Sequence, residues 1–385
     1  MMEKEKPKQR EERNREALVD TACRELMVYG IWNRKMKLKQ CVKKYLLKRK
    51  TAPEDVIFWP TGFLAVGLWQ YRQESAALCD MTCEEVDAAL SAYYERWMRK
   101  KSPVFYLDDL LAGEVLLSAY EEYEKGRSVF ISAQNADRYW NAVEKLVDFG
   151  MRYPTDEMGS FPYRAAQGSG HVFVDAIGLA CPFLYHYGTA CRRGDAAELA
   201  VKQIVNFLAY GMDGVTGLPY HGYSMKTTYK YGIIGWGRAA GWLLRGMTGC
   251  MTTEYGAERL EEAFVKLIDT VITYQRKDGY FSWQLQALDG PADTSATGMI
   301  CAALKQGILS GVLTEPKYGQ ALQAGRNAIR KSIRDGKVYD CSGECEGFGQ
   351  YPQRYGAHPW SLGPALMLCY VPLENESMER KHDGR

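Results

Sequence analysis

The sequence predicts an all-α protein, an (α/α)6 toroid in which six helical hairpins form a double ring. Helical periodicity recurs along the chain, between short loops that carry Gly, Pro, Asp and Asn. Some of these segments are apolar on nearly every side and others are amphipathic, which is typical of inner helices surrounded by outer ones. No run of alternating β-branched residues indicates a sheet of any size.

Twelve helices are expected, and they follow one another in pairs. In the first half of the chain they cover residues 14–32, 60–73, 83–99, 109–125, 135–151 and 174–192. In the second half they cover residues 195–211, 236–252, 257–275, 293–311, 317–333 and 358–370. The segment 36–49 is either an extension of the first helix or a short extra helix.

The apolar segments identify the inner ring. FWPTGFLAVGLWQY, DAIGLACPFLYHYG and GWGRAAGWLLRGM are apolar all round, and a helix of that kind must be buried on every side. AERLEEAFVKLIDTVITY has one apolar face and fits the outer ring. An open solenoid of helical pairs is the alternative architecture, but the chain has no period with recurring sequence identity.

One domain is expected. Apolar residues make up 46% of the 385 residues and aromatic residues 12%, which is enough to bury a large core without disulfides or metal. Length alone suggests two or three domains, but closed architectures of this length often form a single domain. We expect a charged tail at residues 1–13, the helical domain at 14–370 and a polar tail at 371–385.

The composition argues against several classes of protein. Lys plus Arg number 49 and Asp plus Glu 47, a balance that does not favour a nucleic-acid binder. The chain has no apolar run of roughly 18–20 residues for a membrane span, and its start lacks the apolar run of a secretory signal. Eleven irregularly spaced cysteines fit free thiols, so we expect the cytoplasm. The C-x3-C pairs Cys79–Cys83 and Cys341–Cys345 lack a histidine in ligand register, so no metal is expected.

Candidate functional residues precede the expected inner helices. In a toroid these loops meet at one mouth of the ring, and here they are rich in Gly, aromatic and isolated charged residues. They carry Asp108, Asp109, Arg164, His171, Asp175, His221, Trp236, Arg238, Trp242, Trp283, Asp293, Arg354, His358 and Trp360. Tryptophan and tyrosine rings stack on the apolar faces of sugars, and the fork of an arginine matches a carboxylate, so the pattern predicts an acidic-sugar site.

Asp175 is the strongest candidate for a catalyst. It lies within VFVDAIGLACPFL, where an uncompensated carboxylate would cost several kcal/mol. Burial would raise its pKa, which suits a proton donor near neutral pH. A plain helix cap is the alternative interpretation.

Several other candidates have structural explanations. A cap on the following helix is the alternative interpretation of one of Asp108 and Asp109, whereas Asp293 in DTSATGM is expected to be a cap rather than a catalyst. Arg238 lies between Trp236 and Trp242, which is also the pattern of a structural cation–π stack.

Five collinear segments between Trp59 and Leu368 resemble the unsaturated glucuronyl and rhamnogalacturonyl hydrolases, glycoside hydrolase families 88 and 105. The first two are LDDLLAGEVLLSAYEE and FVDAIGLACPFLYHYG. YHGYS followed by WGRAAGW is the third, QRKDGYFSWQL with DTSATGMICAALKQGIL the fourth, and AHPWSLGPALML the fifth. The order of the five, with YH and WGR at the right separation, is more specific than any one segment.

The resemblance implies an (α/α)6 barrel without a cofactor, and hydration of the C4=C5 double bond of a 4,5-unsaturated uronic acid. It implies that Asp175 protonates C4 and then activates the water that attacks C5. Asp108 matches the other important aspartate of the family and Asp109 a neighbouring Asn, although the two could be exchanged. His221, Trp236, Arg238 and Trp242 match positions that line the pocket.

The chain departs from the family pattern at three places. Pro162, Tyr163 and Arg164 replace a common Trp-His-Lys triplet, His171 replaces a common Gln, and Trp360 follows Pro359 where a polar residue is usual. We assign Arg164, His171 and Trp360 to substrate binding, together with Asp109.

The expected function is removal of an unsaturated uronic acid from a small acidic oligosaccharide. A rhamnose-linked, pectin-derived disaccharide is the first choice of substrate and a glycosaminoglycan-type disaccharide the second. The alternatives are another sugar enzyme on the same toroid, such as an ordinary inverting hydrolase, and a non-catalytic carbohydrate-binding protein. No nucleic acid or membrane partner is expected, and a homodimer is allowed.

Overall fold

The computed structural model describes residues 7–32, 34–46, 48, 54–75, 81–128, 130–165, 168–227, 229–251 and 254–370. Its α-helices are α1 (Pro7–Val28), α2 (Arg34–Cys41), α3 (Trp59–Ser75), α4 (Met81–Arg99), α5 (Leu111–Glu124), α6 (Ala136–Met151), α7 (Val174–Ala190), α8 (Gly194–Tyr210), α9 (Gly237–Thr248), α10 (Arg259–Ile272), α11 (Thr294–Leu309), α12 (Pro316–Ser332) and α13 (Pro359–Cys369). A π-helical turn, η1 (Val42–Leu46), extends α2, and a 3-10 turn, η3 (Leu107–Leu110), leads into α5. All twelve predicted helices are present.

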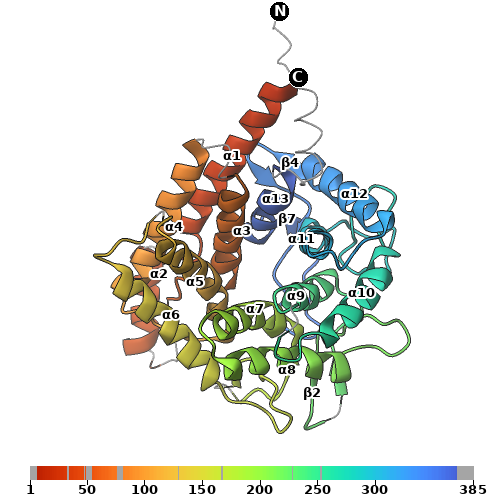
Figure 1. The fold of residues 1–385 in the computed structure, drawn as a ribbon, viewed down its shortest axis with the longest axis horizontal. Coiled ribbons are helices and arrows are strands. Elements are labelled where there is room, and N and C mark those ends of the chain that lie inside the picture. Colours follow the sequence, from red (N-terminus) through yellow and green to blue (C-terminus); the bar gives the residue numbers. More distant parts are fainter. Residues whose placement is uncertain are drawn as a thin grey trace, which may run out of the picture.

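The helices form the predicted double ring. Around the inside, α3 packs on α5, α5 on α7, α7 on α9, α9 on α11 and α11 on α13, and α13 returns to α3 and closes the ring (Figure 1). The outer helices cover this ring, as α8 covers α7 and α12 covers α11. This closure excludes the open solenoid and confirms the (α/α)6 toroid.

Burial explains which helices lie inside. In α7, every residue from Ala176 to Tyr185 is buried, whereas α10 buries one stripe that includes Leu260, Phe264 and Val271. The ring closes through glycine, because a Cβ on Gly67 of α3 would come within 2.3 Å of the Cα of Gly363 in α13. Only a helix pair without side chains at this crossing can approach so closely.

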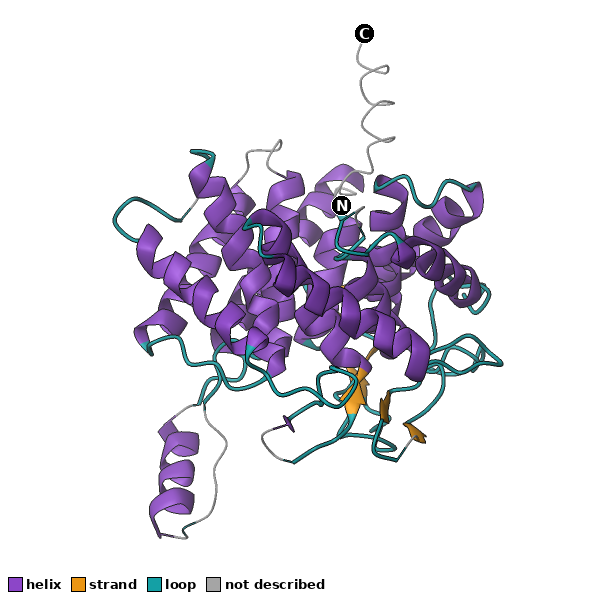
Figure 2. Ribbon diagram, turned by 60° about the horizontal axis from the view of Figure 1, so that its bottom comes forward, coloured by secondary structure: helices purple, strands orange, loops and turns teal. Residues whose placement is uncertain are grey.

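The short strands connect the loops that precede the inner helices. Strands β1 (Val172–Phe173), β2 (Gly222–Ser224) and β3 (Tyr229–Tyr231) form one antiparallel sheet in that order. Two pairs, β4 (Ile333–Arg334) with β5 (Lys337–Val338) and β6 (Cys341–Ser342) with β7 (Tyr355–Gly356), are also antiparallel. Figure 2 shows the strands together on one side of the toroid. They are small, as the sequence predicts.

The chain start differs from the prediction. Helix α1 begins at Pro7, so residues 7–13 are helical and the expected tail 1–13 is wrong in this part. Glutamate, arginine and glutamine are strong helix formers, and proline is favoured in the first turn of a helix. Segment 36–49 contains a separate helix, α2, rather than an extension of α1. Residues 1–6 and the expected tail 371–385 lie outside the described part.

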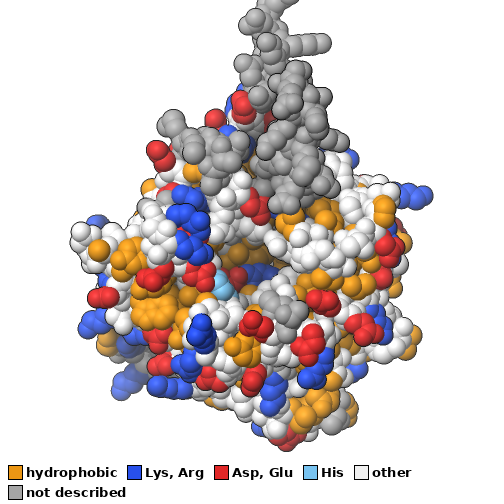
Figure 3. Space-filling model, in the orientation of Figure 1, with side chains coloured by type: hydrophobic (Ala, Val, Ile, Leu, Met, Phe, Trp, Pro, Cys, Tyr) orange, Lys and Arg blue, Asp and Glu red, His pale blue; other side chains and the backbone are white. Residues whose placement is uncertain are grey.

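The axis of the toroid has a cavity at each end. One lies at the N-terminal ends of the inner helices and is described below. The other, of about 460 Å³, is lined by later residues of the same helices, including Arg245 of α9, Gln306 of α11 and Met367 of α13. Figure 3 shows the face of the toroid at which the inner helices end, and this face is hollowed at its centre. No helix within the described ranges is long and apolar enough to cross a membrane.

Candidate active site

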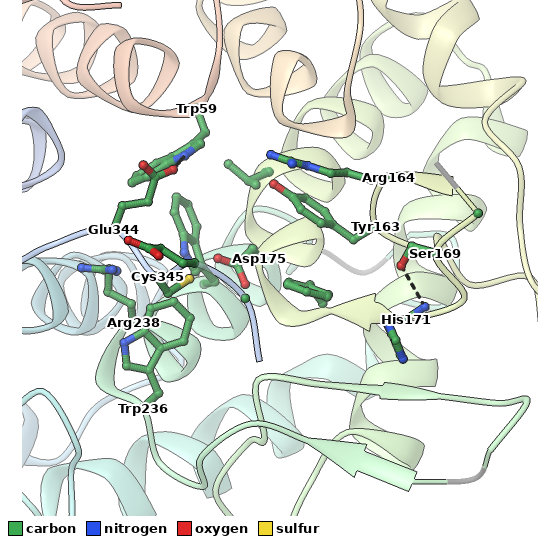
Figure 4. A pocket seen from close by; sticks show the side chains of 16 residues that line it. Trp59, Tyr163, Arg164, Ser169, His171, Asp175, Trp236, Arg238, Glu344 and Cys345 are labelled. Atoms are coloured by element: carbon green, nitrogen blue, oxygen red, sulfur yellow. Dashed lines mark hydrogen bonds between the residues drawn. The ribbon is translucent and has the colours of Figure 1, made fainter. Parts of the chain in front are cut away.

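The cavity at the N-terminal ends of the inner helices has a volume of about 580 Å³, within the usual range for small-ligand sites. It is lined by Trp59, Tyr163, Arg164, Gly168, Ser169, His171, Phe173, Asp175, Leu179, Trp236, Arg238, Trp242, Glu344, Cys345, Glu346 and Gly347. In Figure 4, Glu344 and Arg238 lie on one side of the cavity and Tyr163 and Arg164 on the opposite side. Six of the predicted site residues are therefore in the lining: Arg164, His171, Asp175, Trp236, Arg238 and Trp242.

Asp175 is placed by a helix start and a strand pair. It is the second residue of α7, where the positive end of the helix dipole favours a carboxylate. Strand β1 pairs Phe173 with Gly222, and the amide of Val174 donates to the carbonyl of His221 at 2.9 Å. This register brings the His221 side chain to Asp175, with 3.2 Å between Nε2 and Oδ2. The Asp175 side chain is 16% exposed, so it is accessible from the cavity.

His221 lies behind Asp175 and is fully buried. Its Nδ1 is 2.8 Å from the hydroxyl of Tyr351, and that hydroxyl accepts a 3.3 Å hydrogen bond from the amide of Ile233. A tyrosine hydroxyl that accepts from an amide keeps its own proton to donate, here to Nδ1. When the Tyr351 hydroxyl donates to Nδ1, the His221 proton lies on Nε2 and points at the Asp175 carboxylate.

Aromatic rings form the walls. Trp59 meets Trp242 edge to face, with ring centroids 6.1 Å apart, and Tyr163 stacks on Phe173 at 4.8 Å. The Trp236 ring packs against His221, with centroids 4.7 Å apart. Such walls suit the C–H faces of a pyranose, while the charged groups between them supply polar contacts.

Arg238 is fixed by strand β6 and the residue that follows it. It is 3% exposed, and its Nη1 donates to the carbonyl and hydroxyl oxygens of Ser342 at 2.9 and 2.6 Å, while its Nη2 donates to the Gly343 carbonyl at 2.7 Å. Its guanidinium carbon lies 4.9 Å from the Trp236 ring centroid, so the predicted cation–π stack is present. Among the described residues, none accepts from its Nε–H, which leaves one edge of the guanidinium for a ligand.

Asp293 is a helix cap, as predicted. Its Oδ1 accepts from the amide of Ser295 in the first turn of α11, at 3.0 Å. Its Oδ2 accepts from the hydroxyl of Ser342 at 2.6 Å. The cap therefore also anchors the serine that holds Arg238.

Asp108 lies directly behind the lining rather than in it. It is 4% exposed, and its Oδ2 accepts a 2.8 Å hydrogen bond from the hydroxyl of Tyr163, which does line the cavity. The pKa of Asp108 is raised to about 7, because burial and the nearby Asp175 raise it by more than the Tyr163 hydrogen bond and the Arg164 charge lower it. Asp108 is thus a carboxyl that titrates near neutral pH and reaches the cavity through Tyr163.

Asp109 does not contact the cavity. It is fully buried, and its Oδ2 accepts from the amides of Phe105 and Tyr106 at 2.6 and 3.2 Å, which caps η3. Burial and the neighbouring Asp55 raise its pKa well above the ordinary value. Asp109 therefore holds the first turn of η3 and is not the N-cap of α5, a position that Leu110 occupies, and Asp108 is the aspartate beside the cavity.

The remaining predicted residues also differ in position. Arg164 lines the cavity with its guanidinium 5.5 Å from the Tyr163 ring centroid. His171 lines it as well and packs edge to face on Tyr231 at 4.8 Å. Trp360 is 3% exposed and outside the lining, where its Nε1 donates to the Ser342 carbonyl. Its ring supports Trp59, with centroids 5.0 Å apart.

One loop supplies residues that the sequence reasoning missed. Glu344 and Glu346 bring carboxylates to the lining, and the indole N–H of Trp59 donates to Glu344 at 3.3 Å. Tyr351 from the same loop holds His221. The signal was present, since acids flanked by glycine and aromatic residues recur in SGECEGFGQY. Within the described ranges, no group of three His, Cys, Asp or Glu side chains is arranged to hold a metal ion.

Comparison with protein families decides the class of the protein. The model of Glycosyl Hydrolase Family 88 matches residues 40–374. The chain belongs to glycosyl hydrolase family 88. This assignment makes it a glycoside hydrolase, as the five collinear segments predicted.

Solved structures share the fold of this family 88 hydrolase. A possible member of the GH105 family from Klebsiella pneumoniae superposes with a TM-score of 0.77 at 15% identity, over 99% of this chain and 96% of that one. An unsaturated glucuronyl hydrolase from Bacillus sp. GL1 superposes with a TM-score of 0.62 at 15% identity, over 91% and 93%. Protein Atu3128 of Agrobacterium fabrum is 29% identical over 164 residues, which are 39% of this chain and 70% of that protein.

Proposed function

We propose that this family 88 hydrolase removes a 4,5-unsaturated uronic acid from the non-reducing end of oligosaccharides that a polysaccharide lyase has produced. The observation that carries the proposal is the position of Asp175, whose carboxyl faces an aromatic-walled cavity and lies 3.2 Å from buried His221. Structural relatives named unsaturated glucuronyl hydrolases support the choice of substrate class.

The proposed reaction is hydration of the C4=C5 double bond. Asp175 gives its proton to C4, and positive charge develops at C5 and the ring oxygen. Its carboxylate then takes a proton from the water that attacks C5, which regenerates the acid. The product is a hemiketal at C5, and its collapse opens the ring and releases the second sugar. The Nε2–H of His221 stabilises the carboxylate between the two proton transfers.

We assign recognition of the uronate to Arg238. Its bonds to Ser342 and Gly343 use Nη1 and Nη2, and the Nε–H with the second Nη2–H forms a fork toward the cavity. Such a fork matches the two oxygens of a carboxylate. Arg164, on the opposite side of the cavity, adds a second positive charge.

Rhamnose is the favoured second sugar. Two carboxylates, Glu344 and Glu346, lie in the lining. They would repel a sulfated glycosaminoglycan sugar, whereas a neutral deoxy sugar pays no such cost. A pectin-derived disaccharide therefore fits better than a sulfated glycosaminoglycan disaccharide. We place the reaction in the cytoplasm, because free cysteines such as Cys23 and Cys41 suit a reducing compartment.

We propose that Asp108 acts on the substrate through Tyr163. Its carboxyl fixes the phenol that faces the cavity, and its pKa of about 7 lets the pair change charge near neutral pH. In this role Asp108 positions Tyr163, while Asp175 carries out the proton transfers.

A conventional glycosidase is the second candidate. Glu344 places a second carboxylate in the same cavity as Asp175, and an inverting hydrolase needs two carboxyl groups about 6.5–9.5 Å apart. Such an enzyme would cleave saturated disaccharides and leave a double bond intact.

The test uses two disaccharides that differ only at C4 and C5, one with the double bond and one saturated. Loss of the ultraviolet absorbance of the double bond, with release of rhamnose, supports hydration. Cleavage of the saturated compound at an equal rate would support the conventional mechanism instead. Sulfated and unsulfated glycosaminoglycan disaccharides, assayed in parallel, decide between the two aglycones.

A further inference from the structure

Residues 34–46 form a helical arm, made of α2 and η1, that buries none of its residues. Figure 2 shows this arm standing away from the toroid, on the side where the short strands lie. Its base is held at Glu54, which accepts from the amide of Trp32 at 3.1 Å and lies 4.0 Å from Lys37 Nζ. Neither the barrel core nor the cavity lining uses the arm.

The arm concentrates positive charge. Between Glu25 and Glu54 the chain has no acidic residue. The arm itself carries Arg34, Lys35, Lys37, Lys39, Lys43 and Lys44. Lysines so close together repel one another, so the arm would be stabilised by an anionic surface. The nearly equal numbers of acidic and basic residues in the whole chain hide this local excess of positive charge.

The arm also exposes apolar side chains. Five of the eleven large hydrophobic residues that are exposed in the described part of the chain lie here. They are Met36, Leu38, Val42, Tyr45 and Leu46, with exposures of 42%, 67%, 37%, 70% and 75%. Leu38, Val42 and Tyr45 follow one another at spacings of four and three residues, and lysines lie between them in the sequence. Exposed apolar side chains gathered on one protruding segment mark an interaction surface.

We propose that the arm docks the protein on the surface of an anionic lipid bilayer. An arm that carries exposed apolar side chains among lysines can place the apolar side chains among the acyl chains and the cations at the headgroups of an anionic bilayer. The binding partner of the arm must contact both the lysines and the exposed apolar side chains. An acidic polysaccharide or nucleic acid would use the lysines and leave Leu38 and Tyr45 in water. A second copy of the arm would bring like charges together.

This proposal replaces the expectation that the protein has no membrane partner, and it does not depend on the sugar reaction. The arm lies on the same side of the toroid as the strands that border the cavity, so docking would turn that side toward the bilayer. The arm would lie on the surface and would not span the bilayer, because no helix among the described residues can do so.

The test is co-sedimentation of the full-length protein with vesicles. We expect about tenfold more protein to pellet with vesicles of phosphatidylglycerol and phosphatidylcholine than with phosphatidylcholine alone, and less at high ionic strength. The double variant Leu38→Asp with Tyr45→Asp should lose about tenfold in binding to the anionic vesicles. Changing the five lysines of the arm to Gln should have a similar effect.

Matched controls lie elsewhere on the surface. Val215→Asp alters an isolated apolar side chain that is 95% exposed, and Lys266→Gln with Lys277→Gln removes exposed charge outside the arm. Both should bind as the parent does, and circular dichroism should show unchanged helix content in every variant.

Three outcomes would overturn the proposal. Equal pelleting with both vesicle types, or with neither, would show that the anionic bilayer is not the partner. Full vesicle binding by the Leu38→Asp and Tyr45→Asp variant would show that the apolar side chains are not needed. The arm would then be a segment that binds anionic polymers through its lysines. A dimer in light scattering that this same variant dissociates would show that a second copy covers the apolar face.

Discussion

The Nε2 atom of His221 lies 3.2 Å from the Oδ2 atom of Asp175, and the pairing of β1 with β2 sets that distance. The relationship joins two segments that are 46 residues apart in the chain. On the other side of the imidazole, the hydroxyl of Tyr351 lies 2.8 Å from Nδ1. Tyr351, His221 and Asp175 therefore form a row of three side chains that ends at one accessible carboxyl.

Replacing Tyr351 with Phe should weaken catalysis without removing the carboxyl. The variant loses the partner of His221 Nδ1, so the ring can adopt the other tautomer and turn its Nε2 lone pair toward Asp175. We expect kcat to fall roughly 10–100-fold with KM little changed. Nitrogen NMR of labelled histidine should show protonated Nε2 in the parent and a shift of the proton toward Nδ1 in the variant.

Tyr355→Phe is the matched control, because that hydroxyl binds Gln353 on the surface of the same loop. It should leave kcat and the His221 signals unchanged. A Tyr351→Phe variant with parental kcat and an unchanged tautomer would contradict the proposed positioning role.

Asp108 should make stability depend on pH. Its folded pKa of about 7 is raised above the value of roughly 3.9 in an unfolded chain, so the folded state holds a proton that the unfolded state releases. The resulting stabilisation is complete below pH 4 and is lost as the pH rises through 7. Between about pH 5 and 8 the parent should lose about 2–3 kcal/mol of unfolding free energy that Asp108→Asn does not lose.

Urea unfolding at several pH values measures this difference. Asp148→Asn, at a side chain that is 61% exposed, should follow the pH dependence of the parent. If the unfolding free energies of the parent and of Asp108→Asn changed in parallel with pH, Asp108 would be ionised over the whole pH range tested.

Arg238→Lys should weaken recognition of the uronate. Lysine keeps the charge but lacks the planar fork, so we expect KM to rise on the order of tenfold. The variant also loses hydrogen bonds to Ser342 and Gly343, so its thermal stability should fall. A methyl ester of the uronyl substrate separates the two effects, because the parent and the variant should bind it equally weakly. If the parent bound the ester more tightly than the variant does, the uronate carboxylate would not be the group that Arg238 binds.

Gly67→Ala should destabilise the ring closure. The new methyl group would lie 2.3 Å from the Cα of Gly363, and backbone cannot move as a side chain can. We expect the unfolding free energy to fall by about 1–3 kcal/mol despite the better helix propensity of alanine. Gly319→Ala, in α12 with no atom within 4 Å of the added carbon, should instead gain about 0.5–1 kcal/mol. Equal effects of both changes in urea unfolding would argue against a tight α3–α13 crossing.

The ring could be predicted because helix burial is encoded in local periodicity. Apolar segments such as Ala176–Tyr185 must lie inside, and a double ring satisfies them all. Asp175 was identifiable for the same reason, since a lone carboxylate in an apolar segment needs an explanation. The boundary at Pro7 was missed because a run of charged residues resembles a tail and a helix equally well.

The depth of side chains in the site could not be predicted. Asp108 lies behind Tyr163, and Trp360 lies behind Trp59, because of how neighbouring helices and loops pack, which no single segment encodes. Glu344 and Tyr351 come from a loop without periodicity. Its course follows from the pairing of β6 with β7, which only the folded chain specifies.

The most direct test of Asp175 is turnover in heavy water. If its carboxyl protonates C4, the open-chain product made by the parent should carry one deuterium at that carbon at early times, before the C5 ketone exchanges its neighbouring hydrogens, as NMR and mass spectrometry of a time course would show. Asp175→Asn should fold normally, bind the disaccharide and lose on the order of 10²–10⁴-fold in kcat. A released sugar that keeps its C4=C5 double bond, or an Asp175→Asn variant with parental kcat, would contradict the account.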